Sequence, residues 1–115
     1  MAECKIDYVE LPSKDGQGSR AFFERAFGWR MIDYGPTYAA FDKATSGLDG
    51  GVQSDPEAAP AAPLVILKTD DLEGALGAVQ AAGGAITAPI MGFPGGRRFH
   101  FREPGGAEMA VWAES

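Results

Sequence analysis

Apolar and polar positions along the chain suggest first an extended segment and then a helix. Residues 5–11 are predicted to form a strand. Residues 19–27 then place four apolar side chains on one face of a helix, with charged residues opposite; they are Phe22, Phe23, Ala26 and Phe27. Ser19 is the predicted N-cap, and Gly28 supplies the left-handed position that ends a helix.

The same order of elements returns in the second half. Residues 63–68 form another extended stretch, and a second helix follows with apolar residues at i, i+3, i+4 and i+7: Leu72, Ala75, Leu76 and Val79. Asp70 or Asp71 is expected to cap its start, and the Gly83–Gly84 pair to end it. Asp15 to Gly28 and Asp71 to Gly84 both span 13 positions, and the two copies are offset by 56 residues. The chain therefore contains an internal repeat.

Short strand-like segments separated by Gly and Pro turns follow each helix. They cover residues 29–34, 37–43 and 49–53 in the first copy, and 85–88, 97–102 and 108–112 in the second. The predicted fold class is α+β: two tandem βαβββ modules form a curved, mixed, eight-stranded sheet around a cleft, with helices outside. We expect one domain over residues 1–115, with modules at about 4–53 and 63–114 and an exposed Pro/Ala linker at 54–62.

Composition narrows the possible partners. The formal net charge is −6, which disfavours binding to nucleic acid or to an anionic membrane surface. Cys4 is the single cysteine, so no intrachain disulfide can form. Because no apolar run is long enough to span a bilayer and no signal-peptide pattern opens the chain, a cytoplasmic location is expected.

Two motifs, one at each end of the chain, are informative in combination. Residues 6–29 carry a strand, then Asp15, then Phe22-Phe23 and Phe27-Gly28-Trp29. Residues 94–112 carry two predicted strands with a Pro-Gly-Gly turn before each of them. Together the motifs resemble the vicinal-oxygen-chelate superfamily of glyoxalases, bleomycin-resistance proteins and dioxygenases, although Glu103 and Ala107 replace the Asp and Asn that are usual in its closing hairpin. The resemblance implies the fold but not one activity, because the family includes enzymes and pure binding proteins. It also implies a homodimer.

The resemblance further implies where a divalent metal would be held, namely on the first and last strand of each module. The corresponding positions are Tyr8, Leu64, Ala110 and the stretch 50–53, where Gln53 is the best donor. Leu64 and Ala110 have no donor atoms, and a neutral tyrosine is a poor ligand. We therefore expect no metal cofactor of the family's usual kind.

Other polar and aromatic residues are candidates for a metal-independent site. Glu10 and His100 are candidate catalytic groups, because a buried glutamate or a histidine can transfer protons near neutral pH. Strand alternation puts His100 on one face with Arg98, and the resemblance turns that face toward the cleft. The full set of candidate ligand-binding residues is Tyr8, Trp29, Tyr38, Arg98, His100 and Trp112. For several of them a purely structural role remains open, such as packing, pairing of Glu10 with Arg98, or solvent exposure of His100.

Three hypotheses for function follow. The first is a protein that binds a small organic molecule in the cleft without the family's usual metal. The second is a metal-independent lyase or isomerase in which Tyr8, Glu10 and His100 supply acid and base chemistry. The third is a non-catalytic, dimeric interaction module. The sequence does not identify the ligand.

Overall fold

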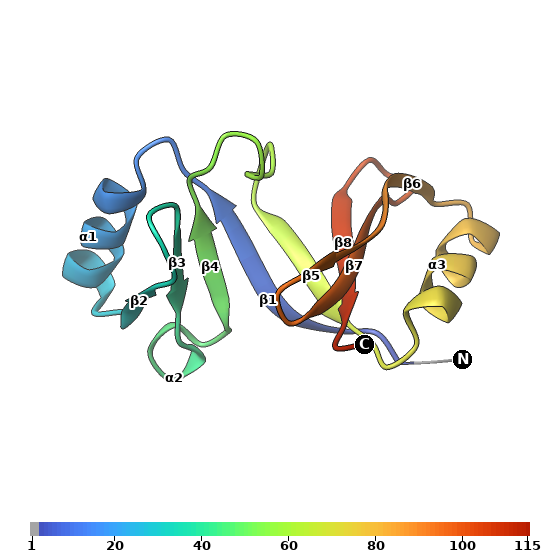
Figure 1. Ribbon diagram of the computed structural model, residues 1–115, viewed down its shortest axis with the longest axis horizontal. Coiled ribbons are helices and arrows are strands. Elements are labelled where there is room, and N and C mark those ends of the chain that lie inside the picture. Colours follow the sequence, from blue (N-terminus) through green and yellow to red (C-terminus); the bar gives the residue numbers. More distant parts are fainter. Residues whose placement is uncertain (1–2) are drawn as a thin grey trace. The chain divides into compact units, whose positions relative to one another are not determined.

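The computed structural model describes residues 3–115, which form two compact units (Figure 1). One unit comprises residues 8–64, and the other comprises residues 65–115 together with residues 3–7. The elements of the first half are β1 (Lys5–Pro12), α1 (Gly16–Phe27), β2 (Met31–Asp33), β3 (Tyr38–Phe41), α2 (Lys43–Ser46) and β4 (Gly50–Gln53). Those of the second half are β5 (Leu64–Lys68), α3 (Leu72–Ala81), β6 (Ala85–Phe93), β7 (Gly96–Arg102) and β8 (Glu108–Ala113).

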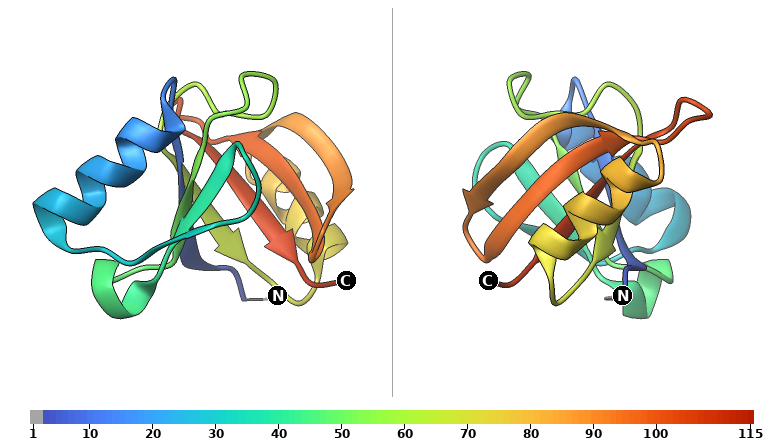
Figure 2. Two further views of the ribbon diagram at one scale, coloured as in Figure 1. Left: turned by 60° about the vertical axis from the view of Figure 1, so that its left-hand side comes forward. Right: turned by 90° about the vertical axis from the view of Figure 1, so that its right-hand side faces the viewer.

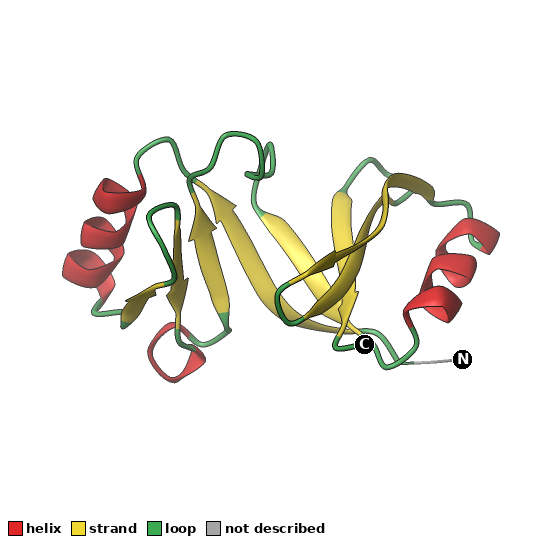
Figure 3. Ribbon diagram, viewed as in Figure 1, coloured by secondary structure: helices red, strands yellow, loops and turns green. Residues whose placement is uncertain are grey.

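The two halves have the same topology, as the repeat predicted. The strand order is β2-β3-β4-β1 in the first half and β5-β8-β7-β6 in the second. In each, the first strand pairs in parallel with the last, and the other pairings are antiparallel. One long helix accompanies each set of strands (Figure 3). The α+β class, the βαβββ modules and the mixed pairing of eight strands are therefore confirmed. The single domain and the cleft remain predictions.

Each helix covers one face of its own strands with a separate core. On the α3 side the buried residues are Leu72, Ala75, Phe99, Phe101, Val111 and Ala113, and Figure 2 (right) shows α3 crossing that face. On the α1 side they are Met31, Ala39, Phe41 and Val52. Within residues 3–115, neither long helix covers the opposite face of its own strands, and we call that face the helix-free face.

The N-terminal helix departs from the sequence prediction at its start and on its apolar face. It begins at Gly16, and its N-cap is Asp15, whose carboxylate accepts a hydrogen bond of 3.0 Å from Gly18 N–H. The prediction of Ser19 as N-cap is therefore wrong, because the helix starts three residues earlier. Phe22 and Phe27 are 57 % and 59 % exposed, so only part of the predicted apolar face packs against the sheet. The helix end is confirmed: Gly28 has a φ of 69°.

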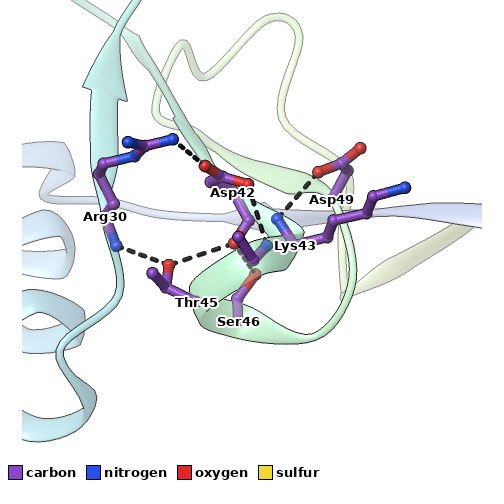
Figure 4. Close-up of polar contacts among 7 residues, drawn as sticks. Arg30, Asp42, Lys43, Thr45, Ser46 and Asp49 are labelled. Carbon is purple, nitrogen blue, oxygen red and sulfur yellow. Dashed lines mark hydrogen bonds and ion pairs between the residues drawn. The ribbon is translucent and has the colours of Figure 1, made fainter.

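The short helix α2 was not predicted. The segment predicted as a strand to residue 43 ends at Phe41, because Asp42 caps α2 by accepting a hydrogen bond from Ala44 N–H. Figure 4 shows how this turn is tied to its surroundings: Thr45 Oγ1 accepts from Arg30 N–H at 2.9 Å, and Arg30 forms an ion pair with Asp42. These contacts join the start of β2 to the β3–β4 connection.

Strand β6 is longer than the prediction of residues 85–88 and continues to Phe93. The added part of the strand contains Pro89, which lacks the N–H that a central strand needs. β6 lies at the edge of its sheet and contains register shifts on both sides of Ala88, where a proline is tolerated.

Candidate functional site

On the helix-free face of the first half, two tyrosines from different strands contact each other. Tyr8 on β1 and Tyr38 on β3 contact each other through their hydroxyl groups, although β4 lies between these strands. A Cβ atom on Gly51 of β4 would lie closer than 3.0 Å to the Tyr38 ring and hydroxyl. Tyr38 can therefore reach Tyr8 only because Gly51 has no side chain.

Glu10 lies on the same face of β1 as Tyr8, two residues further on. Its Cα partner on β4 is Gly51, the residue that the Tyr38 ring covers. Glu10 is only 4 % exposed. The structure therefore brings together three of the predicted site residues in the first half: Tyr8, Glu10 and Tyr38.

Trp29, the fourth predicted site residue of the first half, lies apart from these three. Its ring stacks on Phe23 of α1 with a centroid distance of 4.9 Å, and it also contacts Phe41, a core residue on the α1 side. Trp29 therefore packs on the α1 side of the sheet, whereas Tyr38 alternates onto the other side. The sequence could not distinguish the two sides, because Trp29 precedes β2 and belongs to no strand.

The helix-free face of the second half carries the remaining candidates. Phe99 and Phe101 of β7 are buried under α3, so Arg98 and His100 point to the opposite side, as the alternation predicted. Trp112 of β8 is the Cα partner of Arg98 and lies on the same face. Neighbouring strands place Ala88 and Ala110 on either side of His100. Small side chains thus flank the histidine.

The surroundings of His100 favour its neutral form. Burial lowers the pKa of His100 below its usual 6.5, nearby Arg98 lowers the pKa further, and Glu108 acts in the opposite direction. A neutral imidazole both donates and accepts a hydrogen bond near neutral pH.

This lowered pKa predicts a pH-dependent difference in stability. His100 takes up a proton more readily in the unfolded chain, so the folded state loses stability as pH falls through about 6.5 toward the lower folded value. We expect wild type to lose more stability between about pH 8 and about pH 5 than His100→Gln does. Urea unfolding at several pH values measures this, and carboxylates common to both proteins cancel in the difference. An equal loss of stability with falling pH in the two proteins would contradict this expectation.

The resemblance implies metal ligands on the first and last strand of each half, and strand register gives the equivalent positions of the two halves. The repeat makes Glu10 equivalent to Ile66, and their partners on the last strands are Gly51 and Ala110. Within the predicted stretch 50–53, the position equivalent to Ala110 is therefore Gly51, and Gln53, the best donor of that stretch, lies two residues further on. The Gln53 side chain instead accepts a hydrogen bond from Asp55 N–H at 3.0 Å.

The four equivalent positions do not fit a divalent cation. They hold a tyrosine, a glycine and two aliphatic residues: Tyr8, Gly51, Leu64 and Ala110. A divalent metal ion in a protein site is held by several imidazole, carboxylate or thiolate donors. Within residues 3–115, His, Cys, Asp and Glu form no group of three or more that could hold a metal ion.

Two surface hollows adjoin α1, and neither is lined by Tyr8, Glu10 or His100. The larger, of about 470 Å³, is an open depression lined partly by Pro12, Lys14, Ser19 and Phe22. The smaller, near the start of α1, has Tyr38 in its lining but holds only about 10 Å³, too little space for an organic molecule. We therefore assign the site to neither hollow.

Comparison with known proteins agrees with this fold. The family model of the Glyoxalase/Bleomycin resistance protein/Dioxygenase superfamily matches residues 5–111, and the chain belongs to this superfamily. No match was found among curated proteins.

Solved structures of similar fold have diverse activities. A superfamily member from Vibrio splendidus 12B01 is 14 % identical with a TM-score of 0.70, and the match covers 100 % of both chains. Methylmalonyl-CoA epimerase from Mycobacterium tuberculosis is 10 % identical with a TM-score of 0.71, covering 96 % of this chain and 88 % of that one. The Mn(II)-bound glyoxalase from Novosphingobium aromaticivorans is 20 % identical with a TM-score of 0.71, covering 99 % of this chain but 40 % of that one. At these identities the likeness shows the fold alone.

Proposed function

We propose that this protein binds a small organic molecule without the divalent metal usual in its superfamily. The observation that supports this proposal is the Tyr8–Tyr38 pair across Gly51. A carboxylate side chain at position 51 would compete with the Tyr38 ring for the same space. Leu64 and Ala110 add no donor atoms. Ligand binding then depends on hydrogen bonds, charge and aromatic contact from the chain itself.

Divalent metals are expected to have no effect on the stability of the protein. A ligand that binds the folded state raises the unfolding temperature, so a resident metal would be detected by its removal. We expect the same unfolding midpoint after treatment with EDTA and after addition of Zn²⁺, Mn²⁺ or Ni²⁺. Differential scanning calorimetry together with elemental analysis measures this. One tightly held metal ion per chain, with a lower midpoint after its removal, would overturn the proposal.

A metal-independent lyase or isomerase is the second candidate, favoured by the state of His100. Neutral His100 can act as a base. Such an enzyme would exchange a carbon-bound hydrogen of its substrate with solvent deuterium, and His100→Gln would abolish the exchange. A binding protein would retain ligand without exchange.

Partners and location remain predictions. The homodimer expected from the resemblance is tested by analytical ultracentrifugation of the whole chain. Among the described helices, none has the length and apolar character needed to cross a membrane. A cytoplasmic location is proposed on the sequence alone.

A further inference from the structure

Four side chains of the second half form a row in which two cations bracket two aromatic rings. The Lys68 ammonium lies 4.9 Å from the centre of the Trp112 ring. The Trp112 and Phe93 ring centres are 6.1 Å apart with an interplanar angle of 55°. The Arg98 guanidinium lies 5.8 Å from the centre of the Phe93 ring. We call this row, Lys68–Trp112–Phe93–Arg98, the cation–aromatic row.

The aromatic rings are held in place by neighbouring groups. Trp112 Nε1–H donates to the Asp7 carboxylate, at 3.1 Å and 3.2 Å from its two oxygens. Phe93 is the last residue of β6 and faces Gly96 across the Pro94-Gly95 turn, in which Gly95 has a φ of 113°. Only glycine adopts that conformation easily, so the turn fixes the position of Phe93. A rigid aromatic surface of this kind needs little ordering on binding.

This fixed surface is partly open to solvent. Phe93 is 37 % exposed and its neighbour Met91 is 50 % exposed. Arg98 and Trp112 are half-buried. Large apolar side chains next to a cation form a surface suited to a molecule with an apolar ring and an anionic group.

The Arg98 end of the row is suited to an anion by the shape of its side chain. A guanidinium has five N–H donors in a planar fork, so it can bind a carboxylate in addition to other partners. His100 follows the buried Phe99 on β7, so its side chain lies on the same face as that of Arg98. The neutral imidazole offers a further N–H there.

We infer that the small molecule is an aromatic carboxylate, whose ring contacts Phe93 and Trp112 and whose carboxylate is bound by Arg98. This inference rests on the proposed function and specifies its ligand class. A bidentate guanidinium–carboxylate contact supplies charge and orientation, and the aromatic pair supplies a surface for edge or offset stacking.

Three matched probes separate the ring from the charge. Phenylacetate has both, phenylacetamide keeps the ring without the charge, and cyclohexylacetate keeps the charge without the aromatic ring. Titration calorimetry with the whole chain in EDTA is expected to show phenylacetate binding about tenfold more tightly than either of the others. The indole fluorescence should change with phenylacetate, and this change should be lost in Trp112→Phe, since the other tryptophan, Trp29, packs beside α1.

Adjacent arginines provide the control. Arg98→Gln should weaken phenylacetate binding about tenfold. Arg97→Gln removes the same charge one residue away, but Arg97 points to the α3 side and binds Glu73 at 2.6 Å, so binding should be unchanged. Phe93→Leu, which keeps the apolar volume, should also weaken binding.

The outcomes separate the two proposals. Equal affinity for the three probes, equal effects of the two arginine variants, or no phenylacetate binding would overturn the inference about ligand class while leaving metal independence intact. Phenylacetate binding that is lost in EDTA and restored by a divalent metal would overturn the proposed function itself.

Discussion

Gly50→Ala is expected to destabilise the protein by about 3 kcal/mol or more, because a methyl group has no space there. The added Cβ would lie closer than 3.0 Å to the Phe41 ring and also to the backbone carbonyl oxygen of Val9 on the paired strand. A ring can rotate away, but the backbone carbonyl of a strand in a parallel pair moves only with its strand. Urea unfolding followed by circular dichroism measures the loss.

The same substitution at two further glycines tests whether the loss of stability depends on the position of the glycine. Gly51→Ala meets side-chain atoms of Tyr38, so the ring can move and the cost should be smaller, although the contact with Tyr8 would break. Gly77 lies in the exposed interior of α3 with no atom near its Cβ position. Gly77→Ala should therefore stabilise the helix by about 0.5–1 kcal/mol. Equal effects at Gly50 and Gly77 would contradict the close parallel pairing of β1 with β4.

Phe99→Ala is expected to destabilise the protein by about 3–5 kcal/mol, the usual cost of removing a fully buried aromatic ring. Phe99 is 0 % exposed and lies in the core between α3 and its strands, where Phe101 is a ring neighbour at 6.2 Å. The cavity left behind cannot collapse easily, because strands lie on both sides of β7.

The same substitution on α1 is the control. Phe27 is 59 % exposed, so Phe27→Ala should cost less than about 1 kcal/mol. Denaturant midpoints of the two variants, with unchanged slopes, give the comparison. A loss at Phe27 as large as that at Phe99 would mean that the exposed helix face is covered in solution, for example by a second copy of the chain.

Local signals explain why much of the fold could be predicted from the sequence. Gly28 ends α1 because a left-handed residue is needed there, and Asp71 caps α3 through Gly74 N–H, only three residues away. Alternation along β7 correctly separated Arg98 and His100 from Phe99 and Phe101. The prediction failed where a local signal was ambiguous, as at Ser19. It also missed helix α2, because the capping residue of that helix, Asp42, lies in a segment predicted to be a strand.

The sequence by itself determined the repeat, the α+β modules and the lack of donor atoms at Leu64 and Ala110, because each of these depends on residue type and short spacing. Only the tertiary structure decided that Tyr8 and Tyr38 meet, that Gly51 corresponds to Ala110, and that Trp29 packs on the α1 side. It also brought Phe93 and Trp112 together. These contacts join residues that lie far apart in the chain or on different strands, so they depend on strand register and side-chain direction, which no short stretch of sequence encodes.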